Sequence, residues 1–203
     1  MSPLAFRISS VFGLLLALAV PLANAQEPTV RVRGTIDRVD GDTYVIKTRA
    51  GEVKVKLPDN VMVVALIKAS LSDIKQGSYV GVAGMPQPDG SQRALEVHIF
   101  PEPMRGTGDG HRGWDLEPTS TMTNGNVEQT AASSDGQVLM LKYKDGEKKI
   151  VVPKDAPIVG YLPGEKGELK AGAKIFIAAA AKQADGILTT PRINVGRGVA
   201  PPM

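Results

Sequence analysis

The feature that most constrains the fold of this chain is an internal repeat. Residues 40–83 align with residues 135–178 without a gap, at a constant offset of 95 positions. Eleven of the 44 aligned pairs are identical, and most of the others keep their polarity. Small length differences extend the match at both ends, so that Gly34 pairs with Gly125 and 89–90 pairs with 185–186. The chain therefore repeats one structural unit twice.

The repeat carries the pattern of short strands joined by tight turns. Residues 52–57 alternate apolar and charged side chains, a period of two that gives a strand one apolar and one solvated face. Residues 95–99 alternate in the same way, which places Glu96 and His98 on the polar face. Asp-Gly pairs separate such runs in both copies, and Asp-Gly favours hairpins because it tolerates positive φ. Five strands are predicted in the first unit, at 29–39, 43–49, 52–57, 79–84 and 93–100.

Residues 61–74 break this pattern between the third and fourth strands. Their apolar run reads equally well as a strand or as a helix. Five short strands with an irregular insertion at this point predict an all-β chain of two tandem small OB-like β-barrel domains. A barrel leaves no exposed sheet edges, and a β-sandwich is the alternative. The predicted boundaries are 26–100 for the first barrel, 101–122 for a Gly/Pro-rich linker, 123–197 for the second barrel and 198–203 for a C-terminal tail.

The N-terminus has the pattern of a cleavable signal peptide. Arg7 supplies a positive charge, 11–22 is a short apolar run, and Ala-Asn-Ala at 23–25 suits a signal peptidase. We therefore expect residues 1–25 to be removed and the protein to be periplasmic or secreted. An uncleaved membrane anchor is the alternative, although a span needs about 20 apolar residues. No later stretch is apolar enough to cross a membrane, so no transmembrane span is expected after cleavage.

The absence of cysteine and the balanced charge constrain how the two units are stabilised and which partners they bind. The chain has 0 Cys, so its stability comes from apolar burial without disulfides. A lone barrel of about 70 residues is marginal under that condition, which favours two units packed on each other. The 24 Lys and Arg stand against 21 Asp and Glu, too even a balance for binding polyanions. Nucleic-acid binding also requires stacking aromatics, and Tyr44 and Tyr143 alone lie beside the strand lysines. No nucleic-acid partner is expected.

Each copy resembles the bacterial periplasmic family of unknown function DUF5666. The resemblance rests on a run of turn and core residues in each copy, namely Leu71, Ile74, Lys75, Gly77, Val80 and Val82, and then Leu169, Lys170, Gly172, Ile175, Ile177, Asp185, Gly186 and Leu188. The first copy departs from the family pattern at Ala50-Gly51 and Ser91-Gln92. Because these are turn and core positions, the resemblance implies the fold and brings no catalytic residue with it.

The linker 101–122 is the part that the repeat does not explain. It mixes glycines, prolines and charges of both signs with the single tryptophan, which predicts one ordered path. One interpretation makes Trp114 an apolar anchor between the barrels, with Arg105 and Arg112 pairing acids on either side. The other makes the loop and its surroundings a binding site. The candidate binding residues are His98, Glu102, Arg105, Asp109, His111, Arg112, Trp114 and Asp115.

A divalent metal ion is one ligand that such a site would suit. His98, His111 and Asp109 are the candidate ligands, since imidazole and carboxylate groups bind zinc, nickel or copper. The fixed spacing of a metal motif is missing, and an anion or small polar ligand at the glycine amides is an equal alternative. No other cofactor is expected.

Catalysis is not expected from this sequence. It has no cysteine nucleophile, no Gly-x-Ser-x-Gly motif, and no carboxylate in an apolar stretch that would raise its pKa. The sequence therefore predicts a non-enzymatic binding or interaction module, with an unidentified protein or envelope component as its partner. The alternative is an accessory protein that binds a small ligand or a divalent metal at the linker.

Overall fold

The computed structural model describes residues 29–201, so the predicted signal peptide 1–25 lies outside the described residues. The chain is all-β with a β-barrel, as the sequence predicts. Within 29–201, no helix is long and apolar enough to cross a membrane.

The strands follow the repeat closely. The first copy and the linker comprise β1 (Thr29–Asp40), β2 (Thr43–Thr48), β3 (Gly51–Lys56), β4 (Met62–Lys68), η1 (Leu71–Asp73), β5 (Tyr79–Pro86), β6 (Gln92–Phe100), η2 (Glu102–Met104) and β7 (Gly110–Gly113). The second copy comprises β8 (Thr121–Ser133), β9 (Gly136–Tyr143), β10 (Gly146–Pro153), β11 (Ile158–Pro163), η3 (Lys166–Glu168), β12 (Lys174–Lys182), β13 (Leu188–Thr189) and β14 (Arg192–Gly196). All five strands predicted for the first copy are present. The ambiguous stretch 61–74 is a strand followed by one short 3₁₀ turn.

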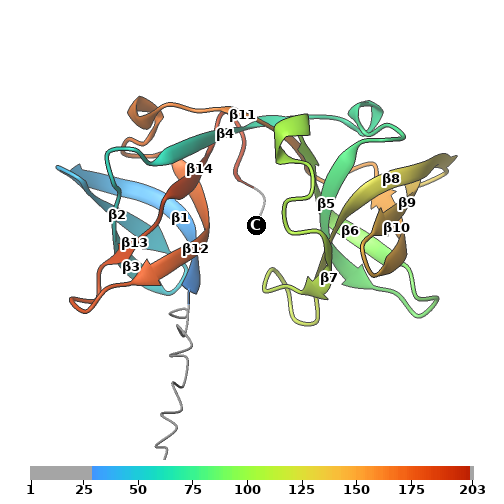
Figure 1. Cartoon of the computed structure of the whole chain (residues 1–203), viewed down its shortest axis with the longest axis horizontal. Helices are drawn as coiled ribbons and strands as arrows, with labels where there is room; N and C mark the ends of the chain where they lie inside the picture. Colours follow the sequence, from blue (N-terminus) through green and yellow to red (C-terminus); the bar gives the residue numbers. More distant parts are fainter. Residues whose placement is uncertain (1–28, 202–203) are drawn as a thin grey trace, which may run out of the picture.

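The two barrels do not follow the two repeats. The first lobe combines β1, β2 and β3 of the first copy with β12, β13 and β14 of the second, and β1 pairs with β12 (Figure 1). The second lobe combines β8, β9 and β10 of the second copy with β5 and β6 of the first. The predicted boundaries 26–100 and 123–197 therefore delimit the repeats, whereas each barrel combines strands from both repeats.

Both lobes close in the same strand order. The first runs β1-β2-β3-β13-β12 and returns to β1, and the second runs β8-β9-β10-β6-β5 and returns to β8. In each ring the third strand pairs in parallel with a strand from the other repeat. Two closed five-stranded rings fit the OB-like barrels that the sequence predicts.

Strands β4 and β11 carry the chain between the lobes (top of Figure 1). They pair with each other in antiparallel fashion, while β4 also pairs in parallel with β14 and β11 with β6. A strand rises about 3.3 Å per residue, so an extended strand such as β4 spans the distance between the lobes. The chain therefore continues into the second lobe and does not fold back onto β1, β2 and β3. In each lobe, the pairings that close the ring join strands of different repeats.

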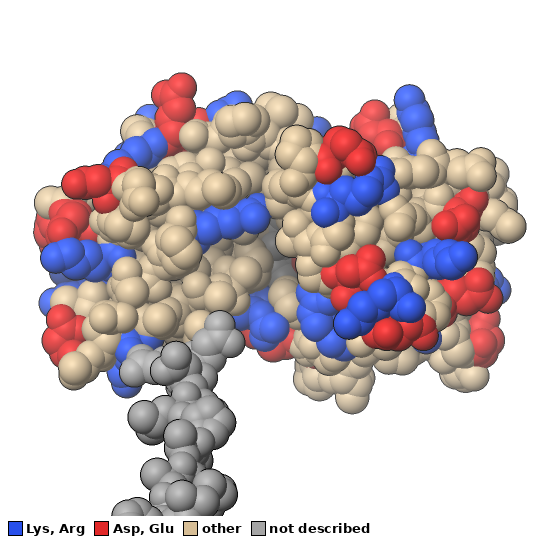
Figure 2. All heavy atoms as spheres, in the orientation of Figure 1, with Lys and Arg blue, Asp and Glu red and all other residues tan. Residues whose placement is uncertain are grey.

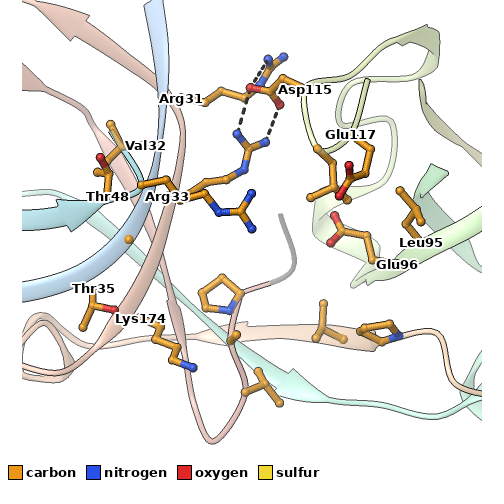
Figure 3. Close-up of a pocket in the computed structure, with 18 of the residues that line it drawn as sticks. Arg31, Val32, Arg33, Thr35, Thr48, Leu95, Glu96, Asp115, Glu117 and Lys174 are labelled. Carbon is orange, nitrogen blue, oxygen red and sulfur yellow. Dashed lines mark hydrogen bonds and ion pairs between the residues drawn. The ribbon is translucent and has the colours of Figure 1, made fainter. Parts of the chain in front are cut away.

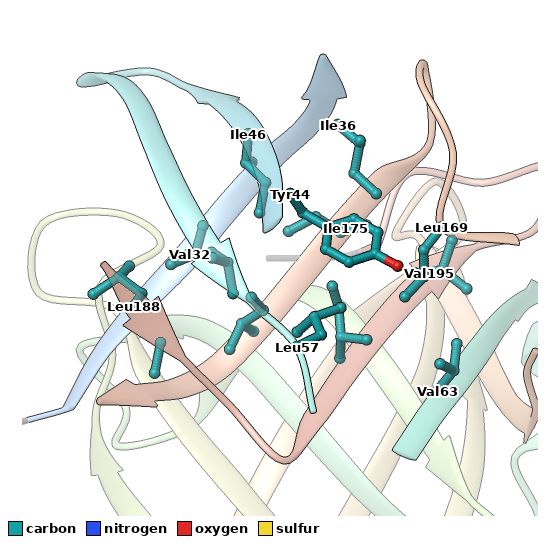
Figure 4. Close-up of a cluster of buried hydrophobic side chains, with 14 of the residues drawn as sticks. Val32, Ile36, Tyr44, Ile46, Leu57, Val63, Leu169, Ile175, Leu188 and Val195 are labelled. Atoms are coloured by element: carbon teal, nitrogen blue, oxygen red, sulfur yellow. The ribbon is translucent and has the colours of Figure 1, made fainter. Parts of the chain in front are cut away.

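The two hydrophobic cores show the same exchange (Figure 4). In the first lobe Ile36 and Ile46 of the first copy pack with Ile175 and Ile177 of the second, all with 0% of their surface exposed. The second core joins 74–99 to 127–158 in the same way. Fully burying such a side chain contributes about 1.5–3 kcal/mol. Each core therefore draws its side chains from both repeats.

Gly34 and its equivalent Gly125 allow the long first strand of each repeat to pair with two neighbouring strands. β1 pairs with β12 over its first half and with β2 over its second half, with a register shift after Ile36. A Cβ on Gly34 would lie 2.1 Å from the Lys47 carbonyl oxygen, and a Cβ on Gly125 would lie 2.6 Å from that of Lys142. Only glycine permits this close approach of the two backbones.

Candidate functional site

The two lobes face each other across a groove with a volume of about 1620 Å³. Figure 2 shows the hollow between the lobes, and Figure 3 shows its two walls. Arg31, Arg33 and Thr35 of β1 line one wall. Glu96 of β6 and Glu117 of the linker line the other. The groove therefore has a basic wall on the first lobe and an acidic wall on the second.

Asp115 of the linker joins the two walls. Its carboxylate accepts hydrogen bonds from Arg33 at 2.6 and 3.0 Å and lies 3.3 Å from Arg31 (Figure 3). These hydrogen bonds, chiefly those from Arg33, hold the pKa of the Asp115 carboxyl below its usual range. The guanidinium of Arg31 also lies 4.0 Å from the centre of the Trp114 ring. The linker thus docks on β1 of the opposite lobe, as the anchor interpretation of Trp114 predicts.

A second cavity of about 270 Å³, here called the inter-lobe pocket, adjoins the groove, and Glu96 lines both. Strands of both lobes, the linker and β11 form its walls. The lining includes Glu96, His98, Phe100, Arg112, Trp114, Asn124, Tyr161, Phe176, Ala178, Arg192 and Asn194. Aromatic rings predominate on its apolar side, where Phe100 and Tyr161 stack with centroids 5.0 Å apart.

One wall of the pocket is a chain of three polar groups. The Tyr161 hydroxyl lies 2.6 Å from His98 Nδ1, and His98 Nε2 lies 3.1 Å from Glu96 Oε1. Burial raises the pKa of the Tyr161 phenol. Because the Glu96 carboxylate only accepts hydrogen bonds and a neutral imidazole carries one N–H, Nδ1 accepts from the Tyr161 hydroxyl. The network then assigns the ring proton to Nε2, which donates to Glu96. His98 and Glu96 are 6% and 4% exposed, so the expected solvated position of this strand face is wrong. The face is covered by the other lobe.

Three residues that line the pocket each have a buried polar side-chain atom without a hydrogen-bond partner within residues 29–201. These atoms are Asn124 Oδ1, Asn194 Oδ1 and Trp114 Nε1. Asn124 and Asn194 are 4% and 7% exposed. The Asn124 amide nitrogen donates to the Thr107 carbonyl at 2.8 Å, which fixes the orientation of its oxygen. Leaving a buried polar group unsatisfied costs about 1–3 kcal/mol, so three in one cavity indicate a missing hydrogen-bonding partner.

The two repeats contribute different residues to this pocket. With the offset given by 89–90 and 185–186, Glu96 is equivalent to Arg192 and His98 to Asn194. All four line the pocket, two from each lobe. The repeats are thus alike in turns and core but differ in charge where they meet.

Arg112 lines the pocket and is exposed to solvent. Its guanidinium donates to the Gly108 carbonyl at 2.7 Å and lies 5.7 Å from the Trp114 ring. Partial burial and the nearby charge of Arg31 lower the pKa of Arg112. Among the described residues no carboxylate forms an ion pair with it, contrary to the predicted pairing of Arg112 with an acid. Arg105 does form such a pair, with Glu102 at 2.6 Å.

The structure brings together half of the predicted binding residues. His98, Arg112 and Trp114 line the pocket, and Asp115 lines the adjoining groove. The other four lie elsewhere on the second lobe. Glu102 and Arg105 pair on the surface, Asp109 accepts from the Lys144 backbone at 2.8 Å, and His111 Nδ1 lies 2.7 Å from the Thr123 hydroxyl.

His98, His111 and Asp109 do not form a metal site together. Each has its own protein partners, Tyr161 and Glu96 for His98, Thr123 for His111, and Tyr79 and Lys144 for Asp109. Within 29–201 no group of three or more His, Asp or Glu is placed to hold a metal ion. The structure does not bring this predicted ligand set together, because the linker strand β7 and strand β6 present their histidines to different neighbours.

Most residues of the pocket lie outside the predicted set, and five of them matter for its polarity. These five are Glu96, Asn124, Tyr161, Arg192 and Asn194. One sequence feature could have indicated these positions. The aligned repeats mostly keep their polarity, but Glu96 aligns with Arg192 and His98 with Asn194.

No family model matches this chain, and neither a curated protein nor a solved structure matches it. The resemblance to DUF5666 therefore stays a prediction.

Proposed function

We propose that this is a non-enzymatic binding protein that takes a small ligand into the inter-lobe pocket. The observation that carries the proposal is the set of unpartnered buried atoms of Asn124, Asn194 and Trp114 in one cavity. A bound molecule that hydrogen-bonds to them would remove the cost of leaving them unsatisfied. Small-ligand sites are concave and mostly apolar with a few polar groups of this kind.

Two further features support a binding role. The pocket lies where two lobes meet, a frequent position for ligand sites. The protons of the Tyr161, His98 and Glu96 chain are all engaged within the wall, which suits positioning better than nucleophilic attack. The signal-peptide pattern is the basis for placing this function in the periplasm. That location and the predicted protein or envelope partner remain proposals.

Thermal unfolding with a panel of small molecules tests the proposal. The panel comprises carboxylates, amines, amino acids, sugars and nucleosides at millimolar concentration. A ligand present at 100 times its Kd adds about 2.7 kcal/mol to the free energy of unfolding, which raises Tm by roughly 5–10 °C in a chain of this size. The fluorescence of Trp114, the single tryptophan, reports binding at the pocket itself.

A pocket-blocking variant identifies the site. Ala178 of β12 is exposed and lines the pocket, so Ala178→Phe fills its mouth at little cost to the fold. Ala181→Phe on the same strand, away from the pocket, is the matched control. The proposal predicts that Ala178→Phe abolishes the Tm shift and that Ala181→Phe keeps it. A panel without any response, or a ligand that shifts Ala178→Phe as much as the unmodified protein, contradicts the proposal.

A further inference from the structure

The polar groups of the inter-lobe pocket offer both donors and acceptors to a ligand. The donors include the guanidinium groups of Arg112 and Arg192 and Trp114 Nε1. Arg112 uses one nitrogen for the Gly108 carbonyl and forms no ion pair with a described acid, so its other N–H groups are available to a ligand in the pocket. A guanidinium binds a carboxylate through two parallel hydrogen bonds, which makes a carboxylate the ligand group that this side of the pocket suits.

The acceptors are the side-chain oxygens of Asn124 and Asn194. They come from β8 of the second lobe and β14 of the first, and both are unpartnered and more than nine-tenths buried. An ammonium group has three N–H donors and no acceptor, so it matches a site lined by carbonyl oxygens. The carboxylate of Glu96, in the same wall as His98, adds negative charge to this part of the lining.

The rest of the lining selects for an apolar substituent. Phe100 and Tyr161 stack at 5.0 Å and Phe176 lines the pocket from the first lobe. The volume of about 270 Å³ lies just below the roughly 300–1,000 Å³ typical of pockets for drug-sized ligands. A single residue-sized molecule therefore fits, and a peptide of several residues does not.

We propose that the ligand is a free α-amino acid with an apolar side chain, its carboxylate on Arg112 and Trp114 Nε1 and its ammonium on the oxygens of Asn124 and Asn194. This inference rests on the proposed small-ligand function and names its ligand class. The Glu96–His98–Tyr161 chain holds the aromatic wall in place beside the bound side chain.

Calorimetry and Trp114 fluorescence with L-phenylalanine and L-leucine test this assignment. N-acetyl-L-phenylalanine lacks the ammonium and L-phenylalanine amide lacks the carboxylate. The geometry predicts that each modification raises Kd at least tenfold relative to L-phenylalanine. This comparison uses the unmodified protein, so it does not depend on whether a variant folds.

Variants then assign each ligand group to its side chain. Arg112→Gln raises Kd for L-phenylalanine at least tenfold and leaves Kd for the amide unchanged, because the amide has no carboxylate to lose. Asn194→Leu weakens L-phenylalanine and leaves N-acetyl-L-phenylalanine unchanged. Arg105→Gln, a linker arginine outside the pocket that pairs with Glu102, is the control and leaves all three affinities unchanged.

The outcomes separate this inference from the proposed function. Equal binding of the free and the modified amino acids, or no binding of either free amino acid at millimolar concentration, overturns the inference. Binding of a different class of molecule that Ala178→Phe abolishes also overturns it, while the pocket keeps its function. Amino-acid binding that survives both Ala178→Phe and Arg112→Gln overturns the inference and the proposed function together.

Discussion

Tyr161 of β11 lies directly opposite Leu66 of β4, and the two residues occupy equivalent positions in the two repeats. Antiparallel strands that pair at equivalent residues have a local two-fold axis between them. The reciprocal exchange of strands follows that axis, since β1 pairs with β12 as β8 pairs with β5. The symmetry is broken on one side, where Tyr161 reaches His98 in the pocket wall.

Replacing Tyr161 tests how much this asymmetric contact contributes. Tyr161→Phe leaves His98 Nδ1 without its donor in a buried site, and we expect a loss of about 1–2 kcal/mol in the free energy of unfolding. Tyr161→Leu, which copies the residue of the other repeat, also removes the stacking on Phe100 and costs more. Urea unfolding measures both, and equal stability of Tyr161→Phe and the unmodified protein would contradict the proton assignment.

The ion pair between Asp115 and Arg33, which joins the lobes, should contribute more to the free energy of unfolding than an ion pair within one lobe. Asp115→Asn removes the bidentate contact with Arg33, at a cost of about 1 kcal/mol. Asp135→Asn removes the exposed pair with Arg93 inside the second lobe and serves as the control, with a smaller loss.

The Asp115 effect also has a defined pH dependence. Because the folded-state pKa of Asp115 is lowered, its contribution is present above the unfolded pKa of about 3.9 and is lost as the pH falls through the folded pKa. The stability difference between Asp115→Asn and the unmodified protein should therefore vanish in strong acid. A difference that stays constant down to that range would exclude the ion pair as its source.

His111 is expected to govern the stability in mildly acidic solution. Partial burial, with smaller effects of Lys148 and Arg112, lowers the pKa of its imidazole. The unfolded chain then takes up a proton first, near pH 6.5, so stability falls as the pH drops from there to the folded pKa. His111→Asn should flatten the stability profile in this window, as measured by chemical unfolding at a series of pH values. An unchanged slope in the variant would assign the effect to other groups.

The two equivalent glycines should tolerate no side chain. Gly34→Ala and Gly125→Ala each place a Cβ against a backbone carbonyl, at 2.1 and 2.6 Å, and we expect a loss of about 2–3 kcal/mol. Gly113→Ala, with nothing within 4 Å of its new Cβ, is the matched control and should be close to neutral. Similar Tm values for the three variants would contradict the close approach.

The local structure could be predicted from the sequence because alternation and Asp-Gly turns act within a few residues. The exchange could not, since β5 and β12 have the same pattern and either satisfies β1 equally well. This also explains the error at Glu96 and His98. Their alternation with Leu95 and Val97 predicts a polar face, but only the position of the other lobe decides whether that face meets water or a pocket. Trp114 was predictable as a site residue because it is the single tryptophan and lies outside the repeat.

The exchange decides which strands meet at the pocket, because its second-lobe wall combines β6 of the first repeat with β8 of the second. Disulfide trapping tests this directly, since the chain has no cysteine of its own. Thr35 pairs with Lys174 in the first lobe, and its repeat equivalent Asn126 pairs with Tyr79 in the second. Paired strand residues have Cα atoms about 4.5–5.5 Å apart, within reach of a disulfide.

The exchanged and the contiguous arrangements predict opposite cross-links. If the repeats exchange strands as described, Thr35→Cys with Lys174→Cys forms an intramolecular disulfide under mild oxidation, and Asn126→Cys with Lys174→Cys does not. Mass spectrometry of the digested monomer identifies the bond. A disulfide in the Asn126–Lys174 pair, and none in the Thr35–Lys174 pair, would show that each repeat closes its own barrel and would contradict the account.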